Sequence, residues 1–124
     1  MNFTNKVVWI TGASSGIGKA LAIQLSKLDA QLILSARNEE RLLTVKQACE
    51  HPEAIKILPL DLEEYTTMNS KVKEAINWFG RVDILVNNGG ISQRSLASET
   101  SIVVDKRIMN INYLGTVALT KAVL

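Results

Sequence analysis

The 124-residue sequence is poor in the residues that build disulfide frameworks and metal centres. Cys49 is its only cysteine and His51 its only histidine, which excludes an internal disulfide and a cysteine-based metal site. Because Cys49 lies at the end of a predicted helix, we interpret it as a packed or half-exposed thiol rather than a nucleophile. His51 lies beside Pro52 and is interpreted as a solvated loop residue, so the sequence predicts no metal site.

Long apolar runs and an excess of one charge are also absent. No run approaches the ~20 apolar residues of a membrane span, and no signal-peptide pattern precedes the first apolar segment, so we expect a cytoplasmic protein. The 14 basic and 12 acidic residues are scattered along the chain, which argues against a nucleic-acid surface. The hydrophobic fraction of 47% fits one α/β core and the length is too short for two domains.

The most informative segment is the run TGASSGIGK, Thr11–Lys19, which contains three glycines and three hydroxyl side chains. It follows a short apolar segment, Lys6–Ile10, that is typical of a buried strand. Helical spacing then predicts a helix with one apolar face, formed by Ile17, Ala20, Leu21, Leu25 and Leu28. A glycine-rich turn at a helix N-terminus offers unpaired N–H groups and a partial positive charge, so it favours a phosphate.

The spacing of the glycines excludes one kind of phosphate loop. A P-loop has four residues between its glycines and then Gly-Lys-Ser/Thr. Here five residues separate Gly12 from Gly18, and Ala20 follows Lys19, so no hydroxyl is placed for Mg²⁺. The literal G-x-G-x-x-G pattern does not fit either. A glycine-rich turn without any ligand remains the alternative.

Strand and helix patterns alternate along the chain without a linker or a repeat. This alternation predicts parallel strands with right-handed crossovers, and so a Rossmann-like doubly wound α/β sheet of order 3-2-1-4. The expected strands are Lys6–Ile10, Gln31–Ala36, Ile55–Leu60 (shortened or ended by Pro59) and Asp83–Asn88. The further helices are expected from the N-cap Asn38 to about Cys49, from Met68 to Phe79 before Gly80, from Ser98 to Asn110, and from Asn112 onward.

The end of the second strand bears on the choice of nicotinamide cofactor. NAD enzymes carry an acidic residue at this place, about 20 residues beyond the glycines, to bind the ribose 2′-hydroxyl. This strand ends in Ser35-Ala36-Arg37 instead. The planar guanidinium of Arg37 suits a 2′-phosphate, so the sequence favours NADP(H) over NAD(H). The alternative for Arg37 is a solvent-facing residue before a helix.

Three motifs together resemble the short-chain dehydrogenase/reductase family. Thr11–Gly18 matches its T-G-x-x-x-G-x-G pattern, and Asn87–Gly90 (NNGG) matches its Asn-Asn-Ala-Gly motif with Gly89 in the alanine place. Within NINYLGT, Asn110–Thr116, the N-x-x-G segment places Asn112 as the family's catalytic asparagine, which holds a water of the proton relay. An ordinary asparagine near a helix start is the alternative.

The resemblance implies a nicotinamide site at the strand ends. Asp61 would accept a hydrogen bond from the adenine amino group, although it also fits as a helix N-cap. The loop after the fourth strand resembles a branch that acts on steroid-, retinoid- or other lipid-type carbonyls, with Gln93, Arg94 and Ser95 expected near the substrate or in solvent. The positions expected to bind the cofactor are Gly12, Ser14, Ser15, Gly16, Ile17, Gly18, Arg37, Asp61, Leu62, Asn88, Gly89 and Gly90.

The family's active Tyr-x-x-x-Lys pair is absent, because Asn69 follows Tyr65 and Val117 follows Tyr113 at that spacing. We therefore expect residues 1–124 to be the amino-terminal part of one domain of an NADP(H)-dependent oxidoreductase that acts on a carbonyl or alcohol, inactive by itself. By resemblance the complete protein would be a homodimer or tetramer. The alternative is a truncated, non-catalytic nucleotide-binding or interaction module.

Overall fold

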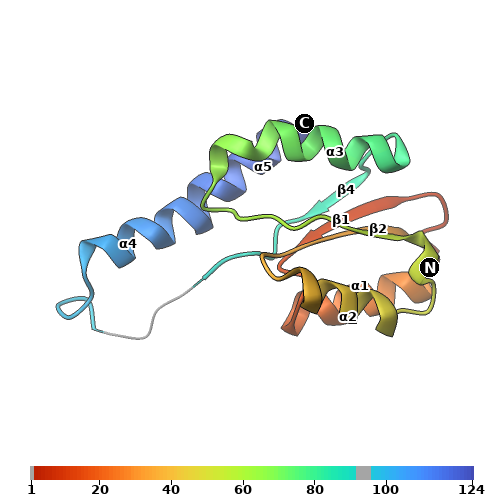
Figure 1. The fold of residues 1–124 in the computed structure, drawn as a ribbon, viewed down its shortest axis with the longest axis horizontal. Coiled ribbons are helices and arrows are strands. Elements are labelled where there is room, and N and C mark those ends of the chain that lie inside the picture. Colours follow the sequence, from red (N-terminus) through yellow and green to blue (C-terminus); the bar gives the residue numbers. More distant parts are fainter. Residues whose placement is uncertain (1, 92–95) are drawn as a thin grey trace.

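A computed structural model describes residues 2–91 and 96–124, which fold into a parallel sheet with helices on both faces (Figure 1). The sheet order is β3-β2-β1-β4, and each neighbouring pair of strands runs parallel. This confirms the 3-2-1-4 order that the sequence predicts. The strands are β1 (Val7–Thr11), β2 (Gln31–Ser35), β3 (Ile55–Ile57) and β4 (Ile84–Val86).

The helices are α1 (Gly16–Lys27), α2 (Glu39–Ala48), α3 (Met68–Phe79), α4 (Ile102–Met109) and α5 (Thr116–Val123), with a π-helical turn at Asn110–Gly115. Short 3₁₀ turns lie at Pro52–Ala54 and Tyr65–Thr67. Helices α1 and α2 cover one face of the sheet, α3 and α5 cover the other, and α4 projects away at one end (Figure 1). In the described part of the chain no helix has the length and apolar composition needed to cross a membrane.

The central strand β1 divides its side chains between two cores. Val8 and Ile10 belong to the core covered by α1 and α2, and Val7 and Trp9 belong to the core covered by α3 and α5. All five residues of β1 are buried, because a parallel sheet with helices on both faces leaves neither side of its central strand in water. This double cover explains why the segment before the glycines is apolar without alternation.

A buried hydrogen bond joins the two central strands. The indole Nε1 of Trp9 donates to Oγ of Ser35 at 2.8 Å, and both residues are fully shielded from solvent. Water cannot replace either partner there, so each polar group depends on the other. The bond therefore fixes the orientation of the largest side chain in the core near the carboxyl ends of β1 and β2.

The predicted strands are confirmed in existence and order, but two of them end early. The regular part of β3 stops at Ile57, although the Leu58 amide still donates to the Leu34 carbonyl of β2 at 2.9 Å and the Leu60 amide donates to the Ala36 carbonyl just beyond β2 at 3.0 Å. Pro59 between them has no N–H, and only an edge strand tolerates it. Strand β4 stops at Val86 because the chain turns out of the sheet there, with the Asn88 amide bonded back to the Val86 carbonyl.

Helix α1 presents a different face to the sheet from the one that its apolar spacing predicts. Its buried residues are Gly18, Ala22, Leu25 and Ser26, whereas Ile17 is 78% exposed and Ala20 is exposed as well. The expectation for those two side chains was wrong. Close packing of Gly18 against the glycine turn sets the rotation of the helix, so Gly18, Ala22 and Ser26 face inward beside Leu25.

The helix caps follow the sequence in part. Asn38 caps α2 by accepting the Arg41 amide at 3.1 Å, and Gly80 ends α3 with a left-handed backbone, both as predicted. Helix α4 begins at Ile102 rather than Ser98, because Ser101 supplies its N-cap and the preceding residues form a separate turn. The interruption expected at Asn112 is a π-helical turn that joins α4 to α5 without a gap.

The substitution Ser35→Ala tests the buried indole bond. It leaves the Trp9 N–H without an acceptor, so the free energy of unfolding should fall by about 1–3 kcal/mol. Urea denaturation of the full-length protein followed by tryptophan fluorescence measures the change. Ser70→Ala on the exposed side of α3 is the matched control; equal stabilities of the two variants would contradict the role of the bond.

Candidate cofactor-binding site

The carboxyl ends of the four strands open onto one cavity of about 860 Å³, which lies in the usual range for small-molecule and cofactor sites. Four strand ends contribute to its lining through the glycine turn after β1, the end of β2 with the start of α2, the chain after β3, and the chain after β4. Ile111 of the π-helical turn adds a fifth segment. Predicted site residues in this lining are Gly12, Ser14, Ser15, Arg37, Asp61, Leu62, Asn88, Gly89 and Gly90. Gly16, Ile17, Gly18 and Asn112 are not part of it.

The glycines make the turn after β1 possible. Gly12 has φ +64°, and a Cβ there would lie 2.9 Å from the carbonyl oxygen of Asn88. A Cβ on Gly18 would lie 2.2 Å from the Gly12 carbonyl oxygen, closer than any real contact. Gly18 thus allows the start of α1 to pack against the backbone of Gly12, and it does not line the cavity.

The N-terminus of α1 is left open towards the cavity. Ser15 occupies the N-cap position, but its side chain makes no capping bond, and the first turn carries no acidic residue. The first amides of a helix have no partner within the helix and carry its positive dipole end. Together with the neighbouring Ser14 hydroxyl, this end of the cavity therefore suits a negatively charged group.

The hydroxyl of Thr11 ties the glycine turn to the segment after β4. Its Oγ1 accepts the amide N–H of Asn88 at 3.1 Å and that of Gly89 at 2.8 Å. The Asn88 side chain returns a bond from Nδ2 to the Gly12 carbonyl at 3.2 Å. Thr11 is buried at the end of β1, so the two walls of the cavity are held at a fixed distance.

The charged side chains of the lining lie on the β2 and β3 side of the cavity. Arg37 lies just beyond β2, and Arg41 follows one helical turn later in α2. On the third wall, Asp61 Oδ1 accepts the Glu63 amide at 2.9 Å, so its carboxylate closes a local turn. Asp61 does not cap a helix, because Glu64 and Thr67 hold the N-cap positions of the helices that follow.

Asn112 acts on the cavity through Ile91. Its Oδ1 accepts the Ile91 amide at 2.7 Å and its Nδ2 donates to the Ile91 carbonyl at 2.5 Å. Both polar atoms of the Asn112 side chain are therefore hydrogen-bonded to the backbone of Ile91. Ile91 itself lines the cavity. A Cβ on Gly90 would lie 2.9 Å from the Asn112 oxygen, so glycine at that position lets the π-helical turn approach the chain after β4.

Several lining residues were not among the candidates from the sequence. They are Thr11, Ser35, Ala36, Asn38, Arg41, Leu60, Ile91 and Ile111. Thr11 could have been predicted, because it is the first residue of the glycine-rich pattern. Arg41 could not, because in the sequence it resembles any basic residue on a solvated helix. The interpretation of Gln93, Arg94 and Ser95 falls on residues outside the described part of the chain.

The single cysteine and histidine lie away from the cavity. Burial raises the pKa of the Cys49 thiol, and a bond to Ser26 opposes the rise only in part; a neutral, buried thiol is a poor nucleophile. The His51 imidazole is partly buried rather than fully solvated, and it lies 3.3 Å from Asp29 and 3.5 Å from Glu53. Across residues 2–91 and 96–124 no group of three or more metal-binding side chains is assembled.

The fold is that of a Rossmann-like α/β protein with one cavity at the strand ends, and comparison with known proteins gives its family. The family model described as short chain dehydrogenase matches residues 6–124. The chain is 52% identical to the mouse and human proteins named dehydrogenase/reductase SDR family member 7. The protein belongs to the short-chain dehydrogenase/reductase family, a family of oxidoreductases that use nicotinamide cofactors.

Solved structures show the same fold at lower identity. A short-chain dehydrogenase/reductase from Brucella melitensis superposes with a TM-score of 0.92 at 30% identity, and one from Bacillus anthracis with 0.91 at 29%. Both alignments cover nearly the whole chain, 99% and 98%, but only 53% and 50% of the solved proteins. The match to the mouse and human relatives likewise spans 37% of their length.

The substitution Thr11→Val tests the link between the two walls. It keeps the shape of the side chain but removes the acceptor of two amides, so hydrogen exchange at Asn88 and Gly89 should become faster, with a stability loss of about 1–3 kcal/mol. Amide exchange of the full-length protein, read residue by residue, measures this. Thr11→Ser retains the hydroxyl and should behave like the wild type; slow exchange in both variants would contradict the assignment.

Proposed function

We propose that this chain is the amino-terminal, cofactor-binding part of a single Rossmann domain in an NADP(H)-dependent oxidoreductase. One observation carries the proposal: four segments from four strand ends meet in one cavity, which includes the turn before α1 with its uncapped helix start and the guanidinium groups that follow β2. The exposed side chain of Ile84 on the edge strand β4 is in keeping with a sheet that continues in the complete protein.

The proposed roles follow the walls of the cavity. The turn from Gly12 to Gly18, with Ser14, Ser15, Gly16 and Ile17, would hold the pyrophosphate on backbone amides. Asp61 and the Leu62 backbone would receive the adenine, since a carboxylate oxygen can accept the exocyclic N–H. Asn88–Gly90 would lie along the nicotinamide-side ribose.

The preference for NADP(H) over NAD(H) is assigned to Arg37. It lines the cavity beyond the end of β2, where an acidic residue would bind a 2′-hydroxyl and repel a 2′-phosphate. A guanidinium presents a planar set of donors that matches phosphate oxygens, and it stays charged at every physiological pH.

Asn112 is proposed to serve the proton relay through its backbone. Its side-chain amide is occupied on both sides by Ile91, so the main chain of the π-helical turn is the part that remains to hold a water. Such turns often mark functional positions in helices. The side chain would then be a positioning group that orients the nicotinamide-side wall.

The proposed reaction is hydride transfer between the nicotinamide and the carbon of a carbonyl or alcohol, the chemistry that the cofactor supplies when bound. Neither Tyr65 nor Tyr113 is followed by a lysine four residues later, as the Tyr-x-x-x-Lys pattern requires. We propose that the serine, tyrosine and lysine of the reaction lie in the rest of the full-length protein. A lipid- or steroid-like carbonyl is the proposed substrate class, and the cytoplasm the proposed location.

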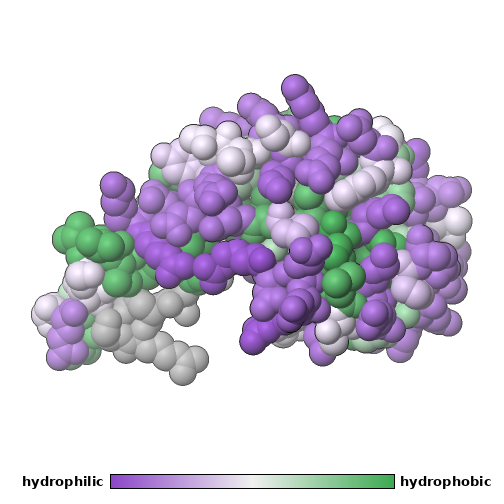
Figure 2. Space-filling model, viewed as in Figure 1, coloured by the Kyte–Doolittle hydropathy of each residue, from purple (hydrophilic) through white to green (hydrophobic). Residues whose placement is uncertain are grey.

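We propose that the complete protein is a homo-oligomer, a dimer or a tetramer. Helix α4 exposes a run of large apolar side chains, and Ile102 and Val103 are each 78% exposed. Figure 2 shows a hydrophobic surface at the far end of this projecting helix, remote from the sheet. A patch of this kind on a soluble protein is typical of an interface.

The substitution Arg37→Asp tests the cofactor preference. It replaces a cation with a carboxylate beside the proposed 2′-phosphate, so NADPH affinity should fall about 10- to 100-fold while NADH affinity is kept or improved. Calorimetric titration of the full-length protein with both cofactors measures this, with Arg81→Asp, outside the cavity, as the control. Unchanged selectivity would contradict the role of Arg37, and a wild type that binds neither cofactor would contradict the proposed function.

A further inference from the structure

We propose that Arg41 is a second specificity-determining residue, which binds the 2′-phosphate of NADP(H) together with Arg37. The inference rests on the proposed cofactor and adds a residue to its site. Arg41 lies in the first turn of α2, four positions after Arg37, and both residues line the same end of the cavity.

In the segment Arg37–Arg41 the basic side chains line the cavity and the acidic side chains do not. Of the five residues from Arg37 to Arg41, the cavity lining contains Arg37, Asn38 and Arg41 but neither Glu39 nor Glu40. Positions 37, 38 and 41 share one side because residues three and four apart come together at a helix start. The segment as a whole is neutral, but the side that it turns to the cavity is positive.

Neither cavity arginine is paired with a carboxylate. Among the described residues, the ion pairs of other arginines are those of Arg81 with Asp83 at 2.9 Å and Arg107 with Glu63 at 3.2 Å. Arg37 and Arg41 take part in no ion pair across residues 2–91 and 96–124, and both are exposed. Their donors are therefore available to a ligand in the cavity.

A phosphate monoester needs more donors than one guanidinium supplies. Its three terminal oxygens carry up to two negative charges, and one planar fork covers two of those oxygens. A second guanidinium, reaching in from the first turn of α2, would serve the third oxygen and balance the second charge. A ribose with a free 2′-hydroxyl offers no such charge, so the gain from Arg41 would be specific to NADP(H).

The N-cap of α2 holds the backbone of Arg41 in a fixed position from which its side chain can extend into the cavity. Asn38 accepts the Arg41 backbone amide at 3.1 Å, which anchors the residue that carries the second guanidinium. The same Asn38 lines the cavity. The N-cap of α2 thus holds the backbone of Arg41 beside the segment that carries Arg37.

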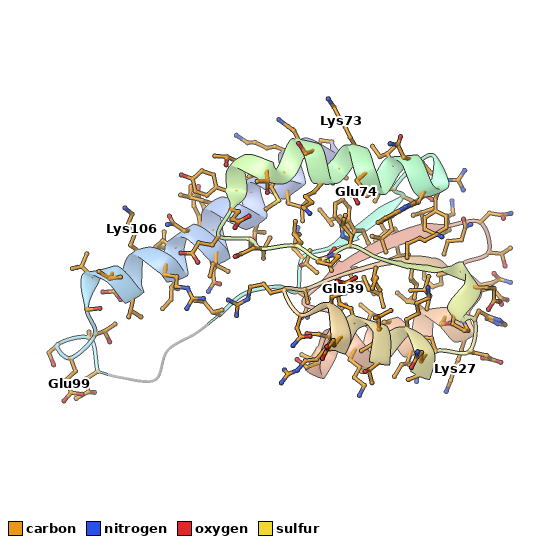
Figure 3. All side chains as sticks on the ribbon, in the orientation of Figure 1. Lys27, Glu39, Lys73, Glu74, Glu99 and Lys106 are labelled. Atoms are coloured by element: carbon orange, nitrogen blue, oxygen red, sulfur yellow. The ribbon has the colours of Figure 1, made fainter. Side chains whose placement is uncertain are left out.

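The test compares four variants of the full-length protein by titration with NADPH and with NADH. Arg41→Gln removes the charge, Arg41→Lys keeps it without the fork, and Arg37→Gln provides the reference for the site. Lys73→Gln is the control of equal charge change, because Lys73 points away from the body on α3 (Figure 3) and lies outside the cavity lining.

We expect Arg41→Gln to weaken NADPH binding about 5- to 20-fold, with NADH binding unchanged and Arg41→Lys in between. Its NADPH affinity should also depend less steeply on salt concentration, which a purely structural role would not produce. Equal losses for both cofactors, or no loss for either, overturn the proposal. If Arg37→Gln alone weakens NADPH binding, Arg41 has no role and the proposed function stands; if the wild type binds both cofactors equally, both proposals fall.

Discussion

The hydroxyl group of Thr11 is the point on which the geometry of the cavity depends. Strand β1 ends there between its two neighbours in the sheet, and one buried oxygen accepts the amides of Asn88 and Gly89. Loss of these bonds would leave the part-buried Gly89 amide without its acceptor, which is costly, so the chain after β4 has little freedom to leave the glycine turn. The Asn88 side chain closes the loop with a bond to Gly12. The walls that would receive the two halves of a dinucleotide are thereby one rigid unit.

The same region explains why Gly89 stands where the resembled motif has alanine. A Cβ at Gly89 would lie 2.9 Å from Cδ1 of Leu62 and 3.1 Å from the Thr11 hydroxyl. Leu62 in turn packs against the π-helical turn, since a Cβ on Gly115 would lie 2.1 Å from its carbonyl oxygen. The volume of Leu62 thus takes the place of the missing methyl group. A methyl group at position 89 would push the end of the Leu62 side chain aside, so glycine eases the close approach of the segments after β1, β3 and β4.

The sequence was sufficient for the order of the strands and for the convergence of their ends. Buried parallel strands, a glycine turn and polar residues at each strand end are local patterns, and the right-handed crossover leaves few topologies. The inward face of α1 was not predictable from apolar spacing, because a backbone contact of Gly18 sets the helix rotation and leaves Ile17 outside. Arg41 could not be assigned either. Its place in the cavity wall depends on how the first turn of α2 is oriented relative to the strand ends, which only the three-dimensional arrangement gives.

The central claim is that one cavity at the strand ends holds NADP(H), with the pyrophosphate at the start of α1 and the adenosine 2′-phosphate beyond β2. A crystal structure of the full-length protein grown with NADP⁺ tests it most directly. We expect a nucleotide that crosses the carboxyl ends of β2, β1 and β4, with its 2′-phosphate within hydrogen-bond distance of Arg37. An ordered nucleotide bound elsewhere, or one whose 2′-phosphate faces solvent away from Arg37, would contradict it.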